Sequence, residues 1–124
     1  MNNAIWIVLV IVIVIGVLNN FLKKTFMNAY SFSLSSITNP VVISTLFLAY
    51  FVWILELWMF SIERGTIIVG FLYGAGILIL IISAFVFMHV LREVTTTSQM
   101  LGLGILIGAG VLSAVGLYLL GVNV

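Results

Sequence analysis

From Gly65 to Met88 the chain carries no charged side chain, and the apolar run around this stretch extends from Thr66 to Val90. About 20 apolar residues are enough for a helix to cross the hydrocarbon core of a bilayer. Three comparable runs occur elsewhere in the chain. In lipid a spanning segment must satisfy its backbone hydrogen bonds internally, so each run is expected to be a helix. The sequence therefore predicts an all-α integral membrane protein with four transmembrane helices, at about 4–22, 41–62, 66–90 and 100–122.

The composition agrees with this class. Of the 124 residues, 65% are hydrophobic and 6% are charged, whereas about a quarter of a soluble domain is charged. The net charge of +1 is too small to suggest nucleic-acid binding, and the absence of cysteine excludes disulfides and thiolate metal sites. We expect a single four-helix domain over residues 1–124, with the lipid bilayer as its first partner.

The first apolar run and the connection after it predict how the chain enters the membrane and where the second helix begins. The run from Ala4 to Leu22 has no basic segment before it, and Lys23 and Lys24 follow it, so we expect a retained helix rather than a signal peptide. From Thr25 to Pro40 aromatic and apolar residues alternate with serine, which predicts an extended or interfacial segment. Asn39 followed by Pro40 marks the start of the second helix.

Four spans place both termini on the same side of the membrane. Lys23, Lys24 and Arg92 then lie on the opposite side, and Arg64 lies with the termini. Basic residues favour cytoplasmic loops, so the termini are expected outside, in a prokaryotic-type inner (plasma) membrane. The difference of three to one is small enough to leave room for insertion in both orientations.

Glycines divide into two groups with different predicted roles. Gly70, Gly74 and Gly76 lie in the first half of the third span, where they weaken the helix and let another backbone approach, so they are predicted to form a helix pivot. In the fourth span Gly104 and Gly108 have GxxxG spacing, and Ala109 and Ser113 continue the line of small residues. This pattern predicts a seam between helices, within the chain or between two chains.

Three segments of the chain are similar to segments that occur in the same order in a known family. The chain resembles the small four-helix members of the drug/metabolite transporter superfamily, which include the small multidrug resistance proteins and the EamA-like half-transporters. The resemblance covers the order and spacing of all four helices, and it implies transport by alternating access in a homodimer or a heterodimer with a similar four-helix chain. The segments are the end of the first helix (16–24), the Gly74-Ala-Gly76 bend of the third helix and the glycine-rich fourth helix (101–111).

One departure from the family pattern limits what the resemblance implies. The small multidrug resistance proteins have a glutamate in the middle of the first helix, and here that position falls at Ile13 or Ile15. Proton-coupled drug efflux is therefore not implied. Some relatives lack this glutamate too, notably the small paired proteins thought to flip lipid-linked aminoarabinose. That subgroup fits better, by elimination.

Glu56 is the only acid well inside a predicted span, and ionisable residues in a membrane are functional candidates. Ala49, Trp53, Glu56 and Phe60 share one helical face by their spacing. A carboxylate between aromatic rings could hold an organic cation. Alternatively, Glu56 reaches the interface, or stays protonated and bonds to a neighbouring backbone group.

A second candidate cluster lies near the other end of the first helix. If the helices pack together, this cluster would form a cationic vestibule suited to a phosphate or an anionic lipid headgroup; its members are Asn19, Asn20, Lys23, Lys24, His89 and Arg92. The alternative is that the lysines only set the topology and that the lone histidine is only hydrogen-bonded.

Tyr73 is included among the predicted substrate contacts, although such an aromatic residue is more often a packing or interface anchor. No catalytic set and no metal-ligand spacing is present. We therefore expect no enzyme activity, no cofactor and no metal.

Two functions remain open at this point. The first is a small transporter or flippase half-unit that acts as a dimer on an amphiphilic small molecule or a lipid-linked substrate. The second is a non-transporting structural or assembly subunit of a larger membrane complex, which the scarcity of buried polar residues would suit.

Overall fold

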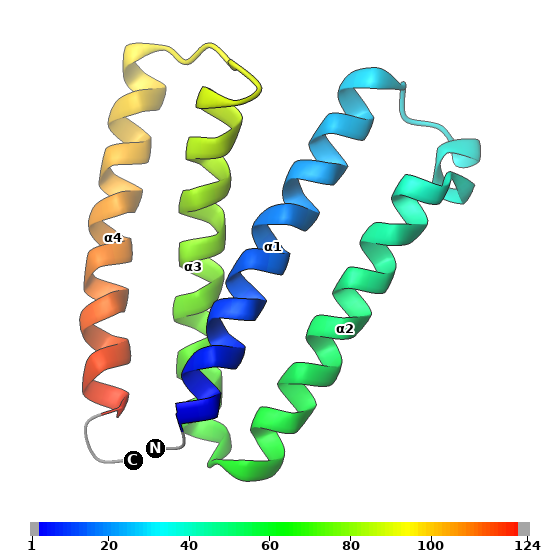
Figure 1. Cartoon of the computed structure of the whole chain (residues 1–124). Coiled ribbons are helices and arrows are strands. Elements are labelled where there is room, and N and C mark those ends of the chain that lie inside the picture. The colour runs from blue at the N-terminus through cyan, green and yellow to red at the C-terminus, as the bar shows by residue number, and fades with distance from the viewer. Residues whose placement is uncertain (1–2, 122–124) are drawn as a thin grey trace.

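The computed structural model describes residues 3–121, which form four long α-helices and one short 3-10 helix (Figure 1). All four long helices are long and apolar enough to cross a membrane, which confirms the predicted all-α, four-helix membrane fold. In chain order the elements are α1 (Asn3–Ala29), η1 (Leu34–Thr38), α2 (Pro40–Ile62), α3 (Gly65–His89) and α4 (Thr97–Gly121).

The boundaries differ from the prediction mainly around the first connection. α1 ends at Ala29 rather than at Leu22, because lysine is a good helix former and its long side chain can reach the interface from within a helix. The prediction of an extended or interfacial segment from Thr25 to Pro40 was wrong in part. Residues 25–29 belong to α1, and residues 34–38 form η1. The predicted end of the last helix, Val122, lies outside the described residues.

Local side-chain caps explain where α2 and α4 begin. The Asn39 side chain accepts a 2.9 Å hydrogen bond from the Val41 N–H, and Pro40 occupies the first turn, as the sequence predicted. Thr96 and Gln99 form a capping box: the Gln99 N–H donates to the Thr96 hydroxyl at 3.2 Å, and the Thr96 N–H donates to the Gln99 side chain at 2.8 Å. This box starts α4 at Thr97 instead of Met100.

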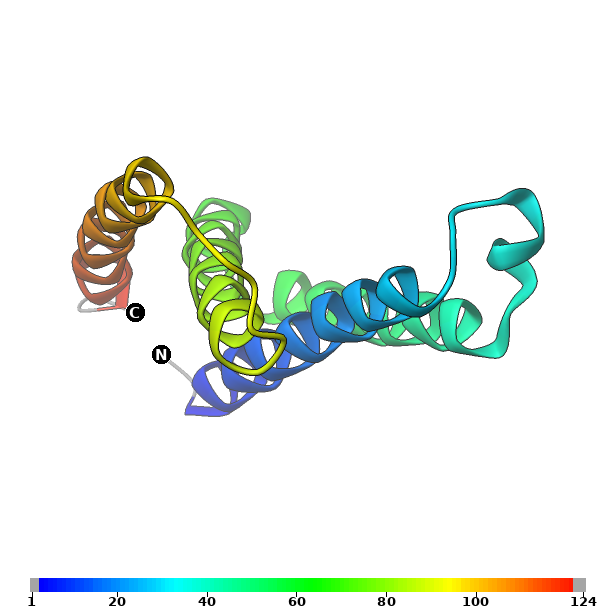
Figure 2. The same cartoon turned by 90° about the horizontal axis from the view of Figure 1, so that it is seen from above.

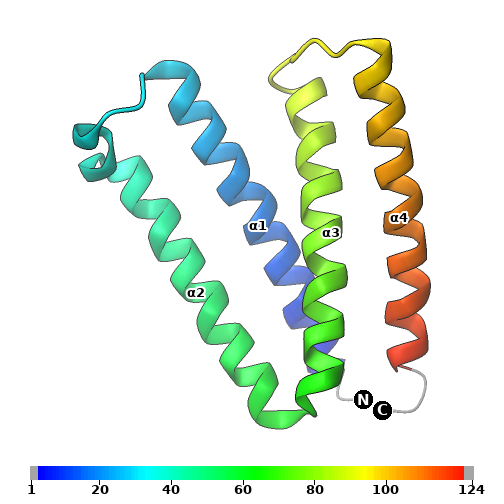
Figure 3. The same ribbon diagram turned by 180° about the vertical axis from the view of Figure 1, so that it is seen from behind.

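The helices run alternately up and down, so the molecule has two distinct ends (Figures 1 and 3). The termini end holds the start of α1, the end of α4 and the tight turn between α2 and α3. The loop end holds η1 and the connection between α3 and α4. The start of α1 and the end of α4 therefore lie at the same end of the molecule, as four spans require.

Viewed along the helices, the order across the molecule is α4, α3, α1, α2 (Figure 2). α1 packs against both α2 and α3, whereas α4 packs against α3 and not against α2. The described helices thus form an open layer in which α2 and α4 are the outer members, rather than a closed bundle.

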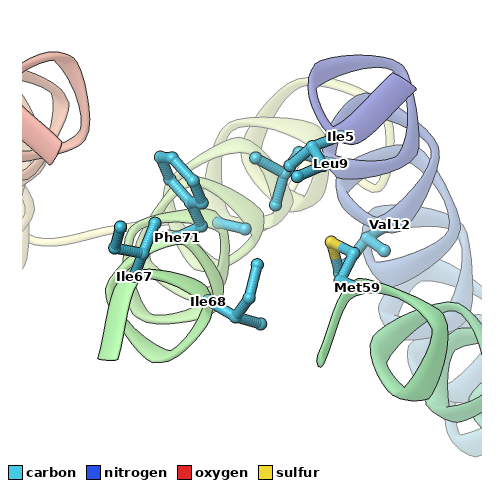
Figure 4. Close-up of a cluster of buried hydrophobic side chains, with 8 residues drawn as sticks. Ile5, Leu9, Val12, Met59, Ile67, Ile68 and Phe71 are labelled. Carbon is cyan, nitrogen blue, oxygen red and sulfur yellow. The ribbon is translucent and has the colours of Figure 1, made fainter. Parts of the chain in front are cut away.

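The best-packed region joins α1, α2 and α3 at the termini end. Its side chains converge from the three helices (Figure 4), and the Trp6 indole meets the Phe71 ring edge-on with centroids 5.3 Å apart. Toward the loop end the α1–α2 pair diverges from the α3–α4 pair (Figures 1 and 3). The buried cluster consists of Ile5, Leu9, Val12, Met59, Ile67, Ile68, Phe71 and Ala75.

Close contact between α3 and α4 depends on glycine at particular positions. A Cβ atom built on Gly74 would lie 2.6–2.9 Å from the side chain of Leu117, which is too close for real atoms. Gly110 of α4 receives the Ile81 side chain in the same way. A Cβ atom on Gly76, two residues after Gly74, would meet nothing within 4 Å.

We expect Gly74→Ala and Gly76→Ala to have opposite effects on stability. The first forces Leu117 and α4 outward, and such overpacking typically costs about 1–3 kcal/mol. The second adds a methyl group in open space, and alanine favours a helix over glycine by up to about 1 kcal/mol in water. Reversible unfolding of both variants in lipid bicelles measures the difference in the free energy of unfolding.

Shortening the opposing side chain provides the control. Gly74→Ala combined with Leu117→Ala should lose less stability than the two single variants added together, because the clash is absent in the double variant. Equal stability of the two single glycine variants would show that α3 and α4 are not in close contact in lipid.

Candidate functional site

A cavity of about 400 Å³ lies between α1, α2 and α3, in the middle of the spanning region. Gly76 contributes to its wall, and its lack of a side chain leaves room between the helices, whereas the Ile79 side chain occupies the space beside Gly16. Its other lining residues are Val12, Ile15, Asn19, Ala49, Val52, Trp53, Glu56, Leu72, Ala75 and Ile79. We call this space the Glu56 cavity.

The Glu56 carboxylate, after which the cavity is named, has no partner within residues 3–121. Glu56 is half-buried, and among residues 3–121 it forms no hydrogen bond and no ion pair. It lies six residues before the end of α2 at Ile62, about 9 Å from the helix terminus at 1.5 Å per residue. An isolated carboxylate at such a depth is costly in lipid, so the position invites a cation or a hydrogen-bond donor.

Asn19 adds a second unsatisfied acceptor on the opposite side of the cavity, on α1. Its Oδ1 atom is buried and has no donor within the part of the chain that the structure describes. Leaving a buried polar atom without a partner costs about 1–3 kcal/mol. Glu56 and Asn19 thus both line one space, where the Glu56 side chain is half-buried and the Asn19 Oδ1 atom is fully buried. A ligand with N–H donors or a positive charge would satisfy the Glu56 carboxylate.

The residues predicted to contact a substrate do not lie together but at several sites on the molecule. Trp53 lines the cavity together with Glu56 and Asn19, as the shared helical face suggested. Phe60 lies outside this cavity, close to Gly65 at the next turn. Tyr73 is 71% exposed and lines the grooves between α3 and α4 instead.

Asn20 and Lys23 belong to a second cavity, of about 570 Å³, between α1 and α3 toward the loop end. Here the Asn20 amide donates a 3.0 Å hydrogen bond to the Ser83 hydroxyl. Lys24 also lines this cavity, and its Nζ lies 3.5 Å from the Glu93 carboxylate. We call this space the lysine cavity.

The lysine cavity contains only part of the predicted vestibule. His89 stacks on Phe85 with ring centroids 6.2 Å apart, and neither His89 nor Arg92 lines the cavity. Arg92 is exposed and has a φ of 53°, so it turns the chain out of α3. Ser83 was not among the predicted residues, although a lone serine inside an apolar run was a signal that could have identified it.

The predicted pivot residues also differ in their surroundings. Gly70 and Gly74 pack against Leu120 and Leu117 of α4, whereas Gly76 lies on the Glu56 cavity. α3 is continuous from Gly65 to His89 in this structure, and the pivot stays a prediction.

The predicted seam residues do not lie along one packed face of α4. Gly104 and Gly108 are exposed, and a Cβ atom on either would meet nothing within 4 Å. Ala109 and Ser113 line grooves between α3 and α4. Among the described residues the α4 glycine that meets α3 is Gly110. Gly104 lines a groove between α3 and α4 as well, and Gly108 remains free for a partner.

Comparison with protein-family models, with curated proteins and with solved structures finds no match for this chain. Membership of the drug/metabolite transporter superfamily therefore stays a prediction from the sequence resemblance.

The Asn20–Ser83 hydrogen bond should contribute measurably to the attachment of α1 to α3. A double-mutant cycle with Asn20→Ala and Ser83→Ala isolates the pairwise term, and such bonds in membrane proteins average about 0.6 kcal/mol. We expect a coupling energy of about that size from unfolding in bicelles. A cycle of Asn20→Ala with the exposed Ser61→Ala, whose hydroxyl donates to the Trp58 carbonyl, should give a coupling near zero. A coupling near zero for Asn20 and Ser83 would show that the bond does not hold the helices together.

Proposed function

We propose that this chain is one half of a small membrane transporter that acts as a dimer and moves an amphiphilic cation by alternating access. The observation that carries the proposal is the Glu56 cavity, which is lined by the half-buried Glu56 carboxylate and by Asn19, both without a donor among residues 3–121. A primary amine or guanidinium supplies both the positive charge and the N–H donors that these acceptors lack. The Trp53 indole adds a ring face that attracts cations.

The rest of the cavity wall is apolar, which suits the hydrophobic part of an amphiphile. Aliphatic side chains of α1 and α3 and the small Ala49 and Gly76 line it. Ligand sites are commonly apolar spaces with a few polar groups that fix orientation. The substrate class supported by this chemistry is an alkylamine-like molecule with one charged end.

The open arrangement of the helices supports the need for a second chain. α2 and α4 lie at the edges of the layer and are not packed against each other, so one chain does not surround a polar path. Transporters often place the substrate between two structural repeats that rock against each other. A second copy, or a similar four-helix chain, would provide the missing wall.

The alternative is a non-transporting subunit of a larger membrane complex. It is favoured by the small buried fraction of the outer helices: only Thr45 and Met59 are buried in α2, and only Gly110 in α4. Flux measurements separate the two functions, because a structural subunit would bind no alkylamine and transport none.

Glu56→Gln should weaken binding of a fluorescent alkylammonium probe by about tenfold or more. A hydrogen bond to a charged group contributes about 1.5–3 kcal/mol, and the neutral amide keeps the size of the side chain. Equilibrium binding and flux are measured in proteoliposomes. Glu63→Gln is the matched control, because Glu63 lies at the turn outside the cavity, beside Arg64. Parent-like binding and flux in Glu56→Gln would contradict the proposed site.

Gly108→Leu should leave the fold of the single chain intact and weaken dimerisation. Gly108 is exposed and a Cβ atom there would meet nothing of its own chain within 4 Å, so a loss of dimer would reflect a second chain at this surface. Gly110→Leu is the contrasting variant, because it collides with Ile81 inside the chain and should unfold more easily. Cross-linking in lipid measures the dimer, and an unchanged dimer in Gly108→Leu would exclude this seam.

A further inference from the structure

The two lysines near the end of α1 have different electrostatic surroundings. Lys24 is paired with Glu93 at 3.5 Å. Lys23 is exposed, and no carboxylate lies within ion-pair distance of it in residues 3–121. Both line the lysine cavity, whose amide and hydroxyl groups, from Asn20 and Ser83, already bond to each other. The cavity therefore carries one uncompensated positive charge, on Lys23.

An apolar groove of about 430 Å³ lies on the neighbouring side of α3, between α3 and α4. It extends along α3 from Met88, near the loop end, to Tyr73. These residues are 15 apart, which corresponds to about 22 Å at 1.5 Å per residue. The groove is thus longer than half of the roughly 30 Å hydrocarbon core, and it runs along the helices.

The groove and the lysine cavity meet on α3. Leu80 and Ala84 line both spaces, and they lie one turn apart on the same face of the helix. These two residues form the boundary between the two spaces, which we call the ridge. Leu80 is 66% exposed, and Ala84 has a small side chain, so the ridge is low. A molecule can therefore lie across this ridge with one end at Lys23 and the other in the groove.

We propose that this surface is a binding site for an anionic phospholipid, with the phosphate at Lys23 and one acyl chain in the α3–α4 groove. Charge complementarity selects this occupant, because the free cation of the lysine cavity lies next to an apolar groove that shares Leu80 and Ala84 with that cavity. Three of the four basic residues, Lys23, Lys24 and Arg92, lie at this end of the molecule, and anionic lipids attract such residues in the cytoplasmic leaflet. The site is distinct from the Glu56 cavity and does not depend on transport.

A bound lipid would stabilise the packing of three helices at once. The headgroup contacts α1, and the acyl chain contacts α3 and α4, at the end of the molecule where the helix pairs diverge. A ligand that binds only the folded state raises its stability in proportion to the logarithm of ligand concentration. Phosphatidylglycerol should therefore raise the unfolding temperature of the parent protein more than phosphatidylcholine does.

The test is native mass spectrometry of full-length protein released from vesicles of phosphatidylcholine with phosphatidylglycerol. The parent should retain phosphatidylglycerol in preference to phosphatidylcholine. Lys23→Gln should reduce this preference about fivefold, since one basic residue near an anionic surface contributes about 1 kcal/mol. Arg92→Gln is the control, because it removes the same charge at the same end but from a residue outside both spaces. Equal retention in both variants, or no preference in the parent, would overturn the proposal.

A second pair of variants tests the acyl chain. Gly104 lines the groove and Gly108 does not, while a Cβ atom on either would meet nothing within 4 Å. Gly104→Phe should reduce retention of both lipids, and Gly108→Phe should leave it unchanged. Equal loss in the two variants would assign the lipid to a seam between chains and reject the groove. Displacement of the lipid by glycerol phosphate at equal concentration would likewise reject it, because that competitor has no acyl chain.

Discussion

Close packing of α3 against its neighbours is the interaction on which the rest of the structure depends. In lipid there is little hydrophobic drive between helices, so association relies on van der Waals contact and on small residues that let backbones approach. α3 is the only described helix that packs extensively on one side against α1 and on the other against α4. At these contacts a large aliphatic side chain on one helix faces a glycine on the other: Ile79 on Gly16, Leu117 on Gly74 and Ile81 on Gly110.

The helices pack more tightly at the termini end than at the loop end, and the polar contacts between helices lie toward the loop end. At the termini end the buried cluster around Phe71 is entirely apolar. Toward the loop end the helix pairs diverge, and there the Asn20–Ser83 hydrogen bond and the Lys24–Glu93 ion pair connect α1 to α3 and to the following link. Polar side chains that belong to neither pair therefore point to an interaction with a ligand or a lipid. In the part of the chain that the structure describes, Glu56 and Asn19 line one cavity as acceptors without donors, and Lys23 is a cation without a carboxylate.

These unpaired groups suggest two separate interactions of opposite sign. The Glu56 cavity has the chemistry of a site for a cationic amphiphile, between α1, α2 and α3. The surface from Lys23 to the α3–α4 groove has the chemistry of an anionic lipid site. α3 contributes to both through different faces, Gly76 on one and Leu80 with Ala84 on the other. A rotation or bend of α3 would therefore affect both sites together.

The sequence by itself determined the number of membrane helices, their alternating direction and the start of α2 at Pro40. These features depend on local physics: hydrocarbon requires that each span satisfy its own backbone, and the Asn39 cap acts within one turn. The connection before η1 was mispredicted, because lysines that flank many spans here continue the helix. Only the tertiary structure decided that Gly110 rather than Gly104 meets α3, that Asn19 and Glu56 share a cavity while Asn20 bonds to Ser83, and that Lys24 is paired while Lys23 is not. The reason is that these spans are apolar on all sides, so their sequences carry no periodic stripe from which the rotation of each helix toward its neighbours could be read.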